Sequence, residues 1–284
     1  MNNFFFFIIP PKKFYKFHKY LFFMVFVKRL IVFLIIVIVL LIIGYLLQLK
    51  SSGRSVANST SVIENSVEES GIVTRVVDGD TIHVNIRGKD ETIRLLGINT
   101  PEKKKSYYFE ARKFLIDNIE NKSVQLVVDR DNVDKYRRRL RYIFYENRLI
   151  NVEIVENGLA TTFMLDSLKY REKFINAEKF ARTNEKGLWR KSSDKCASCI
   201  KLVLLNETLD YFIIKNNCDF YCNLNNWSAK DDANHFFIIS DLNGFEERKY
   251  DSLELFKTEV WNDNGDRFFM RDSAGRLVIF YEYV

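Results

Sequence analysis

The sequence predicts an α+β barrel of five strands and three helices, followed by an all-β part and preceded by one membrane-spanning helix. Three observations lead to this prediction. Residues 30–47 form an unbroken apolar run. Residues 70–191 begin with β-branched segments and end with helical patterns. Residues 192–284 alternate short apolar runs with turns rich in Asn, Asp and Gly, which is typical of antiparallel β-structure.

The apolar run at residues 30–47 is long enough to cross a bilayer, since a helix of this length spans about 27 Å. Basic residues are more frequent before it than after it, which predicts a cytoplasmic N-terminus at residues 1–29 and an extracellular remainder. The topology is the same if translation starts at Met24, because Lys28 and Arg29 remain. A cleavable signal peptide is the alternative, but the run is longer than the apolar region of most such peptides. We therefore expect an uncleaved, single-pass membrane anchor.

The next residues, 48–69, are rich in Ser, Asn and Glu and lack apolar periodicity, which predicts a flexible linker. Charge then divides the rest of the chain. Residues 70–191 carry a net charge of +7, and residues 192–284 carry −6. A polyanion such as a nucleic acid would bind the first of these regions and be repelled by the second.

The predicted barrel comprises residues 70–191. Alternating apolar and polar residues indicate half-buried strands, whereas apolar residues three and four apart indicate helices. Five strands with an inserted helix and two trailing helices fit a barrel of the OB type. The expected strands are 72–77, 81–86, 91–96, 124–128 and 140–145, and the expected helices are about 107–120, 151–157 and 168–183.

Oxygen-bearing side chains gather at the predicted strand ends. Asp78 and Asp80 flank a glycine between the first two strands, and Asn99 and Thr100 follow the third. Carboxylates, an amide and a backbone carbonyl are the ligands that Ca²⁺ or another hard divalent cation prefers. An Asp-Gly-Asp sequence is also an ordinary tight turn, so this motif alone does not establish a site.

Three further residues would complete a phosphodiester hydrolase. Glu102 would take a proton from the attacking water. Arg94 and Arg138 would donate hydrogen bonds to phosphate oxygens as charge builds on them. Arg94 lies within a predicted strand, where the alternative role is a structural ion pair with a neighbouring acid.

The order and spacing of these segments resemble the staphylococcal nuclease family, and the resemblance covers the whole of residues 70–191. It implies an OB-type barrel that hydrolyses DNA, with RNA as a further substrate. The implied metal ligands are Asp80, Asn99 and Thr100, with Asp78 nearby through water. The implied catalytic residues are Arg94, Glu102 and Arg138, and the implied contacts to a substrate phosphate are Lys135 and Tyr136.

Several positions depart from the family pattern. Asn99 stands where the archetype has aspartate, which removes one negative charge from the metal site. Arg137 and Arg139 replace glycines, and Phe163 and Met164 stand where the archetype has a base-stacking tyrosine. The alternative function is therefore a surface-anchored adaptor whose barrel binds nucleic acid or protein without cutting. Retention of both arginines and the glutamate favours an active enzyme.

The segment 192–284 resembles the lamin-tail domain, an immunoglobulin-like sandwich, at residues 210–217, 224–227 and 260–272. This resemblance implies an accessory binding role with an unknown ligand. All four cysteines lie here, and their spacing fits either two disulfides or a four-cysteine zinc site. The predicted extracellular location favours disulfides, with three pairings open. The four are Cys196, Cys199, Cys218 and Cys222.

Overall fold

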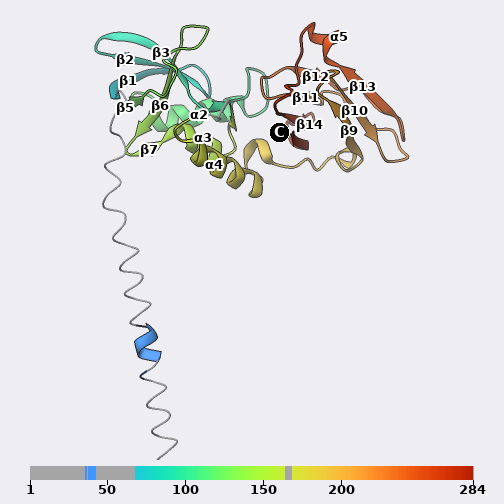
Figure 1. The fold of residues 1–284 in the computed structure, drawn as a ribbon, viewed down its shortest axis with the longest axis horizontal. Coiled ribbons are helices and arrows are strands. Elements are labelled where there is room, and N and C mark those ends of the chain that lie inside the picture. The colour runs from blue at the N-terminus through green and yellow to red at the C-terminus, as the bar shows by residue number, and fades with distance from the viewer. Residues whose placement is uncertain (1–35, 37, 43–67, 164–167, 284) are drawn as a thin grey trace, which may run out of the picture. The chain divides into compact units, whose positions relative to one another are not determined.

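The computed structural model describes residues 36, 38–42, 68–163 and 168–283 (Figure 1). The chain forms two compact units, residues 1–65 and residues 66–284. The predicted membrane anchor and linker lie almost wholly outside the described residues. Within the described ranges, no helix is both long and apolar enough to cross a membrane.

Five strands of the second unit form a closed barrel. They are β1 (Glu68–Val76), β2 (Thr81–Ile86), β3 (Lys89–Leu95), β5 (Ser123–Val127) and β6 (Arg139–Tyr145). The sheet order is β3-β2-β1-β5-β6, and a parallel pairing between β3 and β6 closes it. The predicted five-stranded barrel is confirmed. Its first strand begins at Glu68, inside the predicted linker, because residues 68–72 pair with β5.

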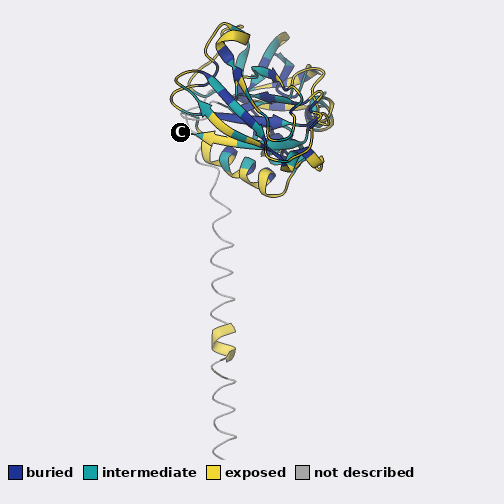
Figure 2. Cartoon of the chain, turned by 90° about the vertical axis from the view of Figure 1, so that its right-hand side faces the viewer, coloured by how far each residue is buried: buried dark blue, intermediate teal, exposed yellow. Residues whose placement is uncertain are grey.

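Three helices cover the barrel: α2 (Tyr108–Ile119), α3 (Ile150–Glu156) and α4 (Arg171–Thr183). Each buries one apolar side, as on α2, where Ala111, Leu115 and Ile119 are fully buried. Residues three or four apart share one side of a helix, so this spacing produces a single buried stripe. Figure 2 shows the same division, with buried strands and exposed outer turns of the helices. Two short strands, β4 (Ile98–Asn99) and β8 (Thr161–Thr162), pair next to α4. The strand β7 (Arg148–Leu149) pairs with β6.

The described residues 192–283, called the C-terminal part below, contain two antiparallel sheets. One has the order β13-β10-β9 and the other β12-β11-β14-β15. Aromatic residues of both sheets share one core, in which Phe212 of β10 contacts Phe237 of β12 and Phe268 of β14. The strands are β9 (Ile200–Asn206), β10 (Tyr211–Asn216), β11 (Ser228–Lys230), β12 (Phe236–Ile238), β13 (Glu247–Asp251), β14 (Asp266–Arg271) and β15 (Leu277–Tyr283). The short helices are η2 (Gly187–Trp189), at the end of the barrel residues, then η3 (Lys195–Ser198) and α5 (Ser252–Phe256).

The four cysteines form two disulfides, Cys196–Cys222 and Cys199–Cys218. The inner pair is nested within the outer pair. Together they attach η3 and the start of β9 to the segment that follows β10.

The C-terminal part packs against residues 68–191, called the barrel part below. Arg267 of β14 is buried and reaches Glu178 of α4 at 2.8 Å, Thr162 of β8 at 3.0 Å, and Asp232 of its own part at 2.7 Å. An apolar contact lies beside it, where Trp189 meets the rings of Phe269 and Phe280. These contacts place the C-terminal part next to β4, where the candidate site begins.

Candidate active site

The turn between β1 and β2 carries the two predicted carboxylates. Oδ1 of Asp78 accepts a hydrogen bond from the backbone N–H of Asp80 at 3.1 Å, which fixes the turn. Gly79 is needed here because a Cβ would lie 2.7 Å from Ala111 and 2.9 Å from Thr100. The close approach lets the turn pack directly against α2 and against the end of β4.

Asp80 lies at the centre of the site and is only 7% exposed. Its Oδ2 accepts hydrogen bonds from the hydroxyl of Thr100 at 2.7 Å and from the backbone N–H of the same residue at 3.1 Å. The guanidinium of Arg94 lies 3.2 Å from that oxygen. A buried carboxylate is costly unless it is paired and hydrogen-bonded, and Asp80 is both.

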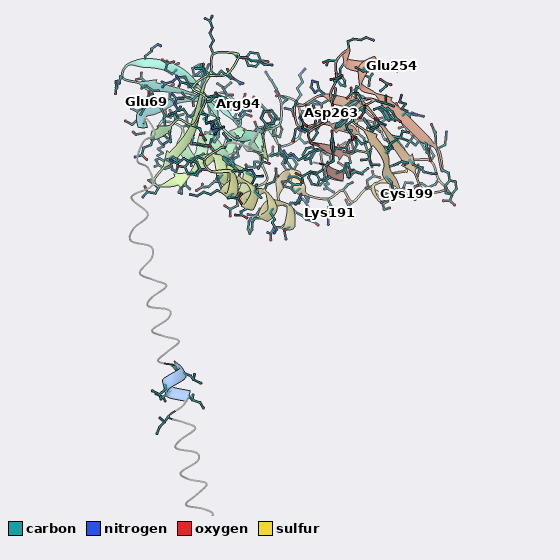
Figure 3. All side chains as sticks on the ribbon, in the orientation of Figure 1. Glu69, Arg94, Lys191, Cys199, Glu254 and Asp263 are labelled. Atoms are coloured by element: carbon teal, nitrogen blue, oxygen red, sulfur yellow. A yellow bond between two sulfur atoms is a disulfide. The ribbon has the colours of Figure 1, made fainter. Side chains whose placement is uncertain are left out.

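Arg94 lies on β3 and is labelled in Figure 3, and its side chain is 13% exposed. Its Nη1 donates to the carbonyl of Leu95 at 2.9 Å, so two contacts fix the plane of the guanidinium. The ion pair is the structural role that the sequence also allowed. Its partner is the candidate metal ligand itself, so the pair belongs to the site.

The two carboxylates of the turn influence each other. Burial and, to a smaller extent, the charge of Asp80 raise the pKa of Asp78 to about 6. Like charges two residues apart disfavour simultaneous ionisation. A cation bound between them would remove this penalty.

Asn99 and Glu102 meet the C-terminal part. The Nδ2 of Asn99 donates to the carbonyl of Asp232 at 2.9 Å. The amide of Asn234 lies 3.3 Å from Oδ1 of Asn99 and 3.4 Å from Oε1 of the exposed Glu102. The amide of Asn99 is therefore oriented by a backbone carbonyl more than a hundred residues away. An aspartate could not donate this hydrogen bond.

Arg138 belongs to a second group, on the tight turn before β6. Asp134 accepts from Nε of Arg138 at 2.7 Å and from its backbone N–H at 2.9 Å. Burial would raise the pKa of Asp134, but these hydrogen bonds outweigh it and lower the pKa. Arg137 adopts a left-handed backbone with φ of 64° at the position of a family glycine. Since β3 pairs with β6 in parallel register from Ile93 and Arg139 onward, the turn that carries Arg138 leads into the strand beside Arg94.

Lys135 and Tyr136 lie on this turn and are exposed. The Tyr136 ring is 67% exposed, and Nζ of Lys135 lies 5.2 Å from its centroid. The guanidinium of Arg138 lies 5.4 Å from the same ring. Contacts thus join Asp78, Asp80, Arg94 and Thr100, and Asn234 links Asn99 with Glu102. Lys135 and Tyr136 lie beside Arg138 on the separate turn before β6.

Asp232 and Asn234 were not predicted as site residues. Neither lies in a recognisable motif, and the net acidity of residues 192–284 argued against a role near a polyanion. Their place depends on the packing of one part against the other, for which the local sequence carries no signal.

Known proteins are similar to the barrel part in sequence. A model described as staphylococcal nuclease homologue matches residues 92–191, which include Arg94, Asn99, Glu102 and Arg138. The chain is similar to the thermonuclease of Staphylococcus intermedius, with 36% identity over 130 residues, 43% of this chain and 77% of the relative. Similarity to the thermonuclease of Staphylococcus hyicus reaches 34% identity over 134 residues, 45% of this chain and 79% of the relative.

The chain belongs to the staphylococcal nuclease family. A further family relative, endonuclease YncB of Bacillus subtilis, is 32% identical over 127 residues, 42% of this chain and 60% of the relative. The family model ends at residue 191, and the lamin-tail resemblance of residues 192–284 stays a prediction.

Proposed function

We propose that this chain hydrolyses phosphodiester bonds of DNA, and of RNA as a further substrate, with a divalent cation such as Ca²⁺. The proposal rests mainly on the buried ion pair between Asp80 and Arg94. Asp80 also accepts a hydrogen bond from Thr100, which stands in sequence between the candidate ligand Asn99 and the candidate base Glu102. The relatives named thermonuclease and endonuclease support a nuclease function.

The donor set fits a hard cation. Asp78 and Asp80 would supply carboxylate oxygens, Asn99 its Oδ1, and Thr100 its backbone carbonyl. Burial is the main cause of the raised pKa of Asp78, and the charge of Asp80, which a cation would neutralise, adds to it. Within the described ranges, no group of three or more His, Cys, Asp or Glu side chains has metal-binding geometry. The proposed site therefore depends on amide and backbone oxygens. When bound, the cation would polarise a phosphate oxygen and favour ionisation of a nearby water.

The protein side chains would carry the remaining steps. Glu102 is exposed, so its carboxylate is accessible to a water and would take the proton as that water attacks phosphorus. Arg94 would donate to a phosphate oxygen, because a guanidinium has five N–H donors and its orientation is already fixed by Asp80. Arg138 would donate from its Nη groups while Nε stays with Asp134. Lys135 and Tyr136 would bind a neighbouring phosphate from the same turn.

We also propose that residues 30–47 anchor the enzyme in the membrane with residues 1–29 in the cytoplasm and the barrel outside. The two disulfides support an extracellular location, since disulfides persist in oxidising compartments. Protease treatment of intact cells tests this topology. Loss of the C-terminal part without loss of a cytoplasmic marker is expected, and full protection would contradict the proposal.

A membrane-anchored adaptor is the second candidate function. The contacts of Asn234 with Asn99 and Glu102 favour it, because they occupy polar atoms that hydrolysis would use. An adaptor of this kind would bind nucleic acid through the barrel and leave it intact.

Plasmid degradation by the purified full chain distinguishes the two functions. With Ca²⁺ we expect cleavage, and with a chelator we expect none. Arg94→Ala and Glu102→Gln should each lower the rate by about 10²–10³-fold, the usual cost of removing a group that stabilises the transition state.

Matched controls are Arg171→Ala and Glu110→Gln, which remove the same groups from exposed positions on α4 and α2. Both should cleave at the wild-type rate. Equal rates in Arg94→Ala and Arg171→Ala, or cleavage that is insensitive to chelator, would refute the nuclease mechanism and favour the adaptor.

A further inference from the structure

A cavity of about 390 Å³ lies between the barrel part and the C-terminal part. Asn99, Thr100 and Lys105 line it from the barrel part, and Lys230 and Arg271 line it from the C-terminal part. Because it begins at two candidate metal ligands, a substrate chain held at the site would continue into it.

Arg271 supplies an unsatisfied donor. Its Nη1 donates to the carbonyl oxygens of Leu188 and Gly275. Its Nη2 is buried and has no hydrogen-bond partner among the described residues. Burial lowers the pKa of Arg271 to about 10. This nitrogen is closed off from the cavity, so Arg271 would act on an anion there through the charge of its guanidinium.

Lys230 adds a second cation, on a half-buried side chain. Its Nζ donates to the carbonyl of Asp231 at 3.1 Å and to Oδ1 of Asn234 at 2.9 Å, which leaves one of its three N–H bonds for a ligand. Burial lowers the pKa of Lys230 to about 8. An anion in the cavity would stabilise the charged form.

One carboxylate, that of Asp272, also lines the cavity. It accepts from the hydroxyl of Ser192 at 2.6 Å and from the backbone N–H groups of Ala274 and Arg276 at 2.9 Å. Both carboxylate oxygens are therefore already engaged, one by Ser192 and the other by the loop at residues 274–276. The lining itself holds more basic than acidic side chains, and the charges of Asp231 and Asp232 also reach Lys230.

The wall also offers an aromatic ring. Phe236 is half-buried, and Nζ of Lys105 lies 3.8 Å from its centroid. An exposed lysine over a ring is a pairing that can bind a phosphate and an adjacent base together. The family's stacking tyrosine is missing from this chain, and the ring of Phe236 comes from a different part of the sequence.

We propose that this cavity binds a backbone phosphate of the nucleic-acid chain, next to the phosphate that is cleaved. The inference rests on the proposed function, and it makes the C-terminal part a component of the substrate site. The ligand class is a phosphodiester within an oligonucleotide.

Binding measured without cleavage tests the proposal. The full chain is titrated in chelator with a fluorescent thymidine octanucleotide and, separately, with inorganic phosphate as competitor. Arg271→Gln should weaken octanucleotide binding about tenfold, and Lys230→Gln and Lys105→Gln about threefold to tenfold, since each removes one charged donor. Inorganic phosphate should displace the octanucleotide from the wild type but not from Arg271→Gln.

The matched control is Lys249→Gln, which removes the same charge from an exposed site on β13, outside the cavity. It should bind as the wild type does. If Arg271→Gln fails to fold, the two lysine variants decide, because Lys105 is exposed.

Three results would overturn the proposal. The first is wild-type affinity in both lysine variants, and the second is an equal loss in Lys249→Gln. The third is phosphate binding that depends on Arg271 while octanucleotide affinity does not, which would indicate an anion site separate from the substrate. Since the assay needs no hydrolysis, an inactive protein with the expected binding pattern would refute the nuclease proposal alone.

Discussion

The two sides of the candidate site are held in different ways. Asp80 and Arg94 find their partners within the barrel part, on β2, β3 and the end of β4. Asn99 and Glu102 find theirs on the C-terminal part, at Asp232 and Asn234. The first side is built by strands close in sequence, and the second exists only when the two parts are packed together. The geometry of the proposed metal site therefore depends on how the C-terminal part packs against Asn99 and Glu102.

Breaking the packing between the two parts should have the largest effect. Arg267 is 7% exposed and lies between Glu178 and Asp232. Burial alone would lower the pKa of Arg267, but the two carboxylates outweigh it and raise the pKa. Arg267→Met leaves both carboxylates without a cation, so we expect a loss of about 3–5 kcal/mol in the free energy of unfolding, measured in urea.

The control for this prediction is Arg171→Met, whose exposed pair with Glu172 should contribute about 0–1 kcal/mol. A similar loss in the two variants would mean that the buried network does not hold the parts together.

Changing Asn99 should weaken the packing between the two parts while strengthening metal binding. Asn99→Asp replaces the N–H that donates to Asp232 with a carboxylate oxygen facing a carbonyl. We expect a loss of about 1–3 kcal/mol in unfolding free energy in chelator, and tighter Ca²⁺ binding by calorimetry because the site gains a charge.

Asn157→Asp is the control, since that exposed amide donates to a carbonyl within its own helix. It should change neither quantity by a similar amount. Weaker Ca²⁺ binding in Asn99→Asp would contradict a ligand role for this position.

The smallest expected effect is that of removing the carboxylate of Asp78, and this effect depends on pH. The pKa of Asp78 is raised from 3.8 to about 6, so its contribution to stability is present below pH 4 and is lost as pH rises through 6. In chelator, Asp78→Asn should therefore be more stable than the wild type by about 1–2 kcal/mol at pH 8. The difference should disappear near pH 4.

Asp117→Asn on the exposed side of α2 serves as the control and should show no such crossover. A variant less stable than the wild type at pH 8 would show that Asp78 contributes favourable contacts that exceed its electrostatic cost.

Much of the barrel was predictable because its signals are local. The strand at residues 81–86 has the predicted bounds, since its alternation of apolar and polar residues reports directly on burial. Ala111, Leu115 and Ile119 were placed on one side of a helix by their spacing, and all three are buried there. The motifs at Asp78–Asp80 and Asn99–Glu102 pointed to one site for the same reason.

The contribution of the C-terminal part was not predictable. Asn99 contacts Asp232 across 133 positions of sequence, and no pattern at either residue indicates the pairing. The charge argument could not resolve single positions. A net charge of −6 over residues 192–284 hides Lys230 and Arg271, which the fold brings to the cavity beside the site. The net charge of a segment does not indicate which of its side chains face another part of the protein.

The nested disulfides have a consequence for an enzyme exposed to proteases. The turn between β9 and β10 contains Leu209, which is 62% exposed, and it lies inside both disulfide loops. A peptide bond cut in this turn would leave the two fragments joined by Cys196–Cys222 and Cys199–Cys218. A nicked molecule would thus migrate as one piece until a reductant separated it, and its wall of the cavity would stay tethered to the barrel.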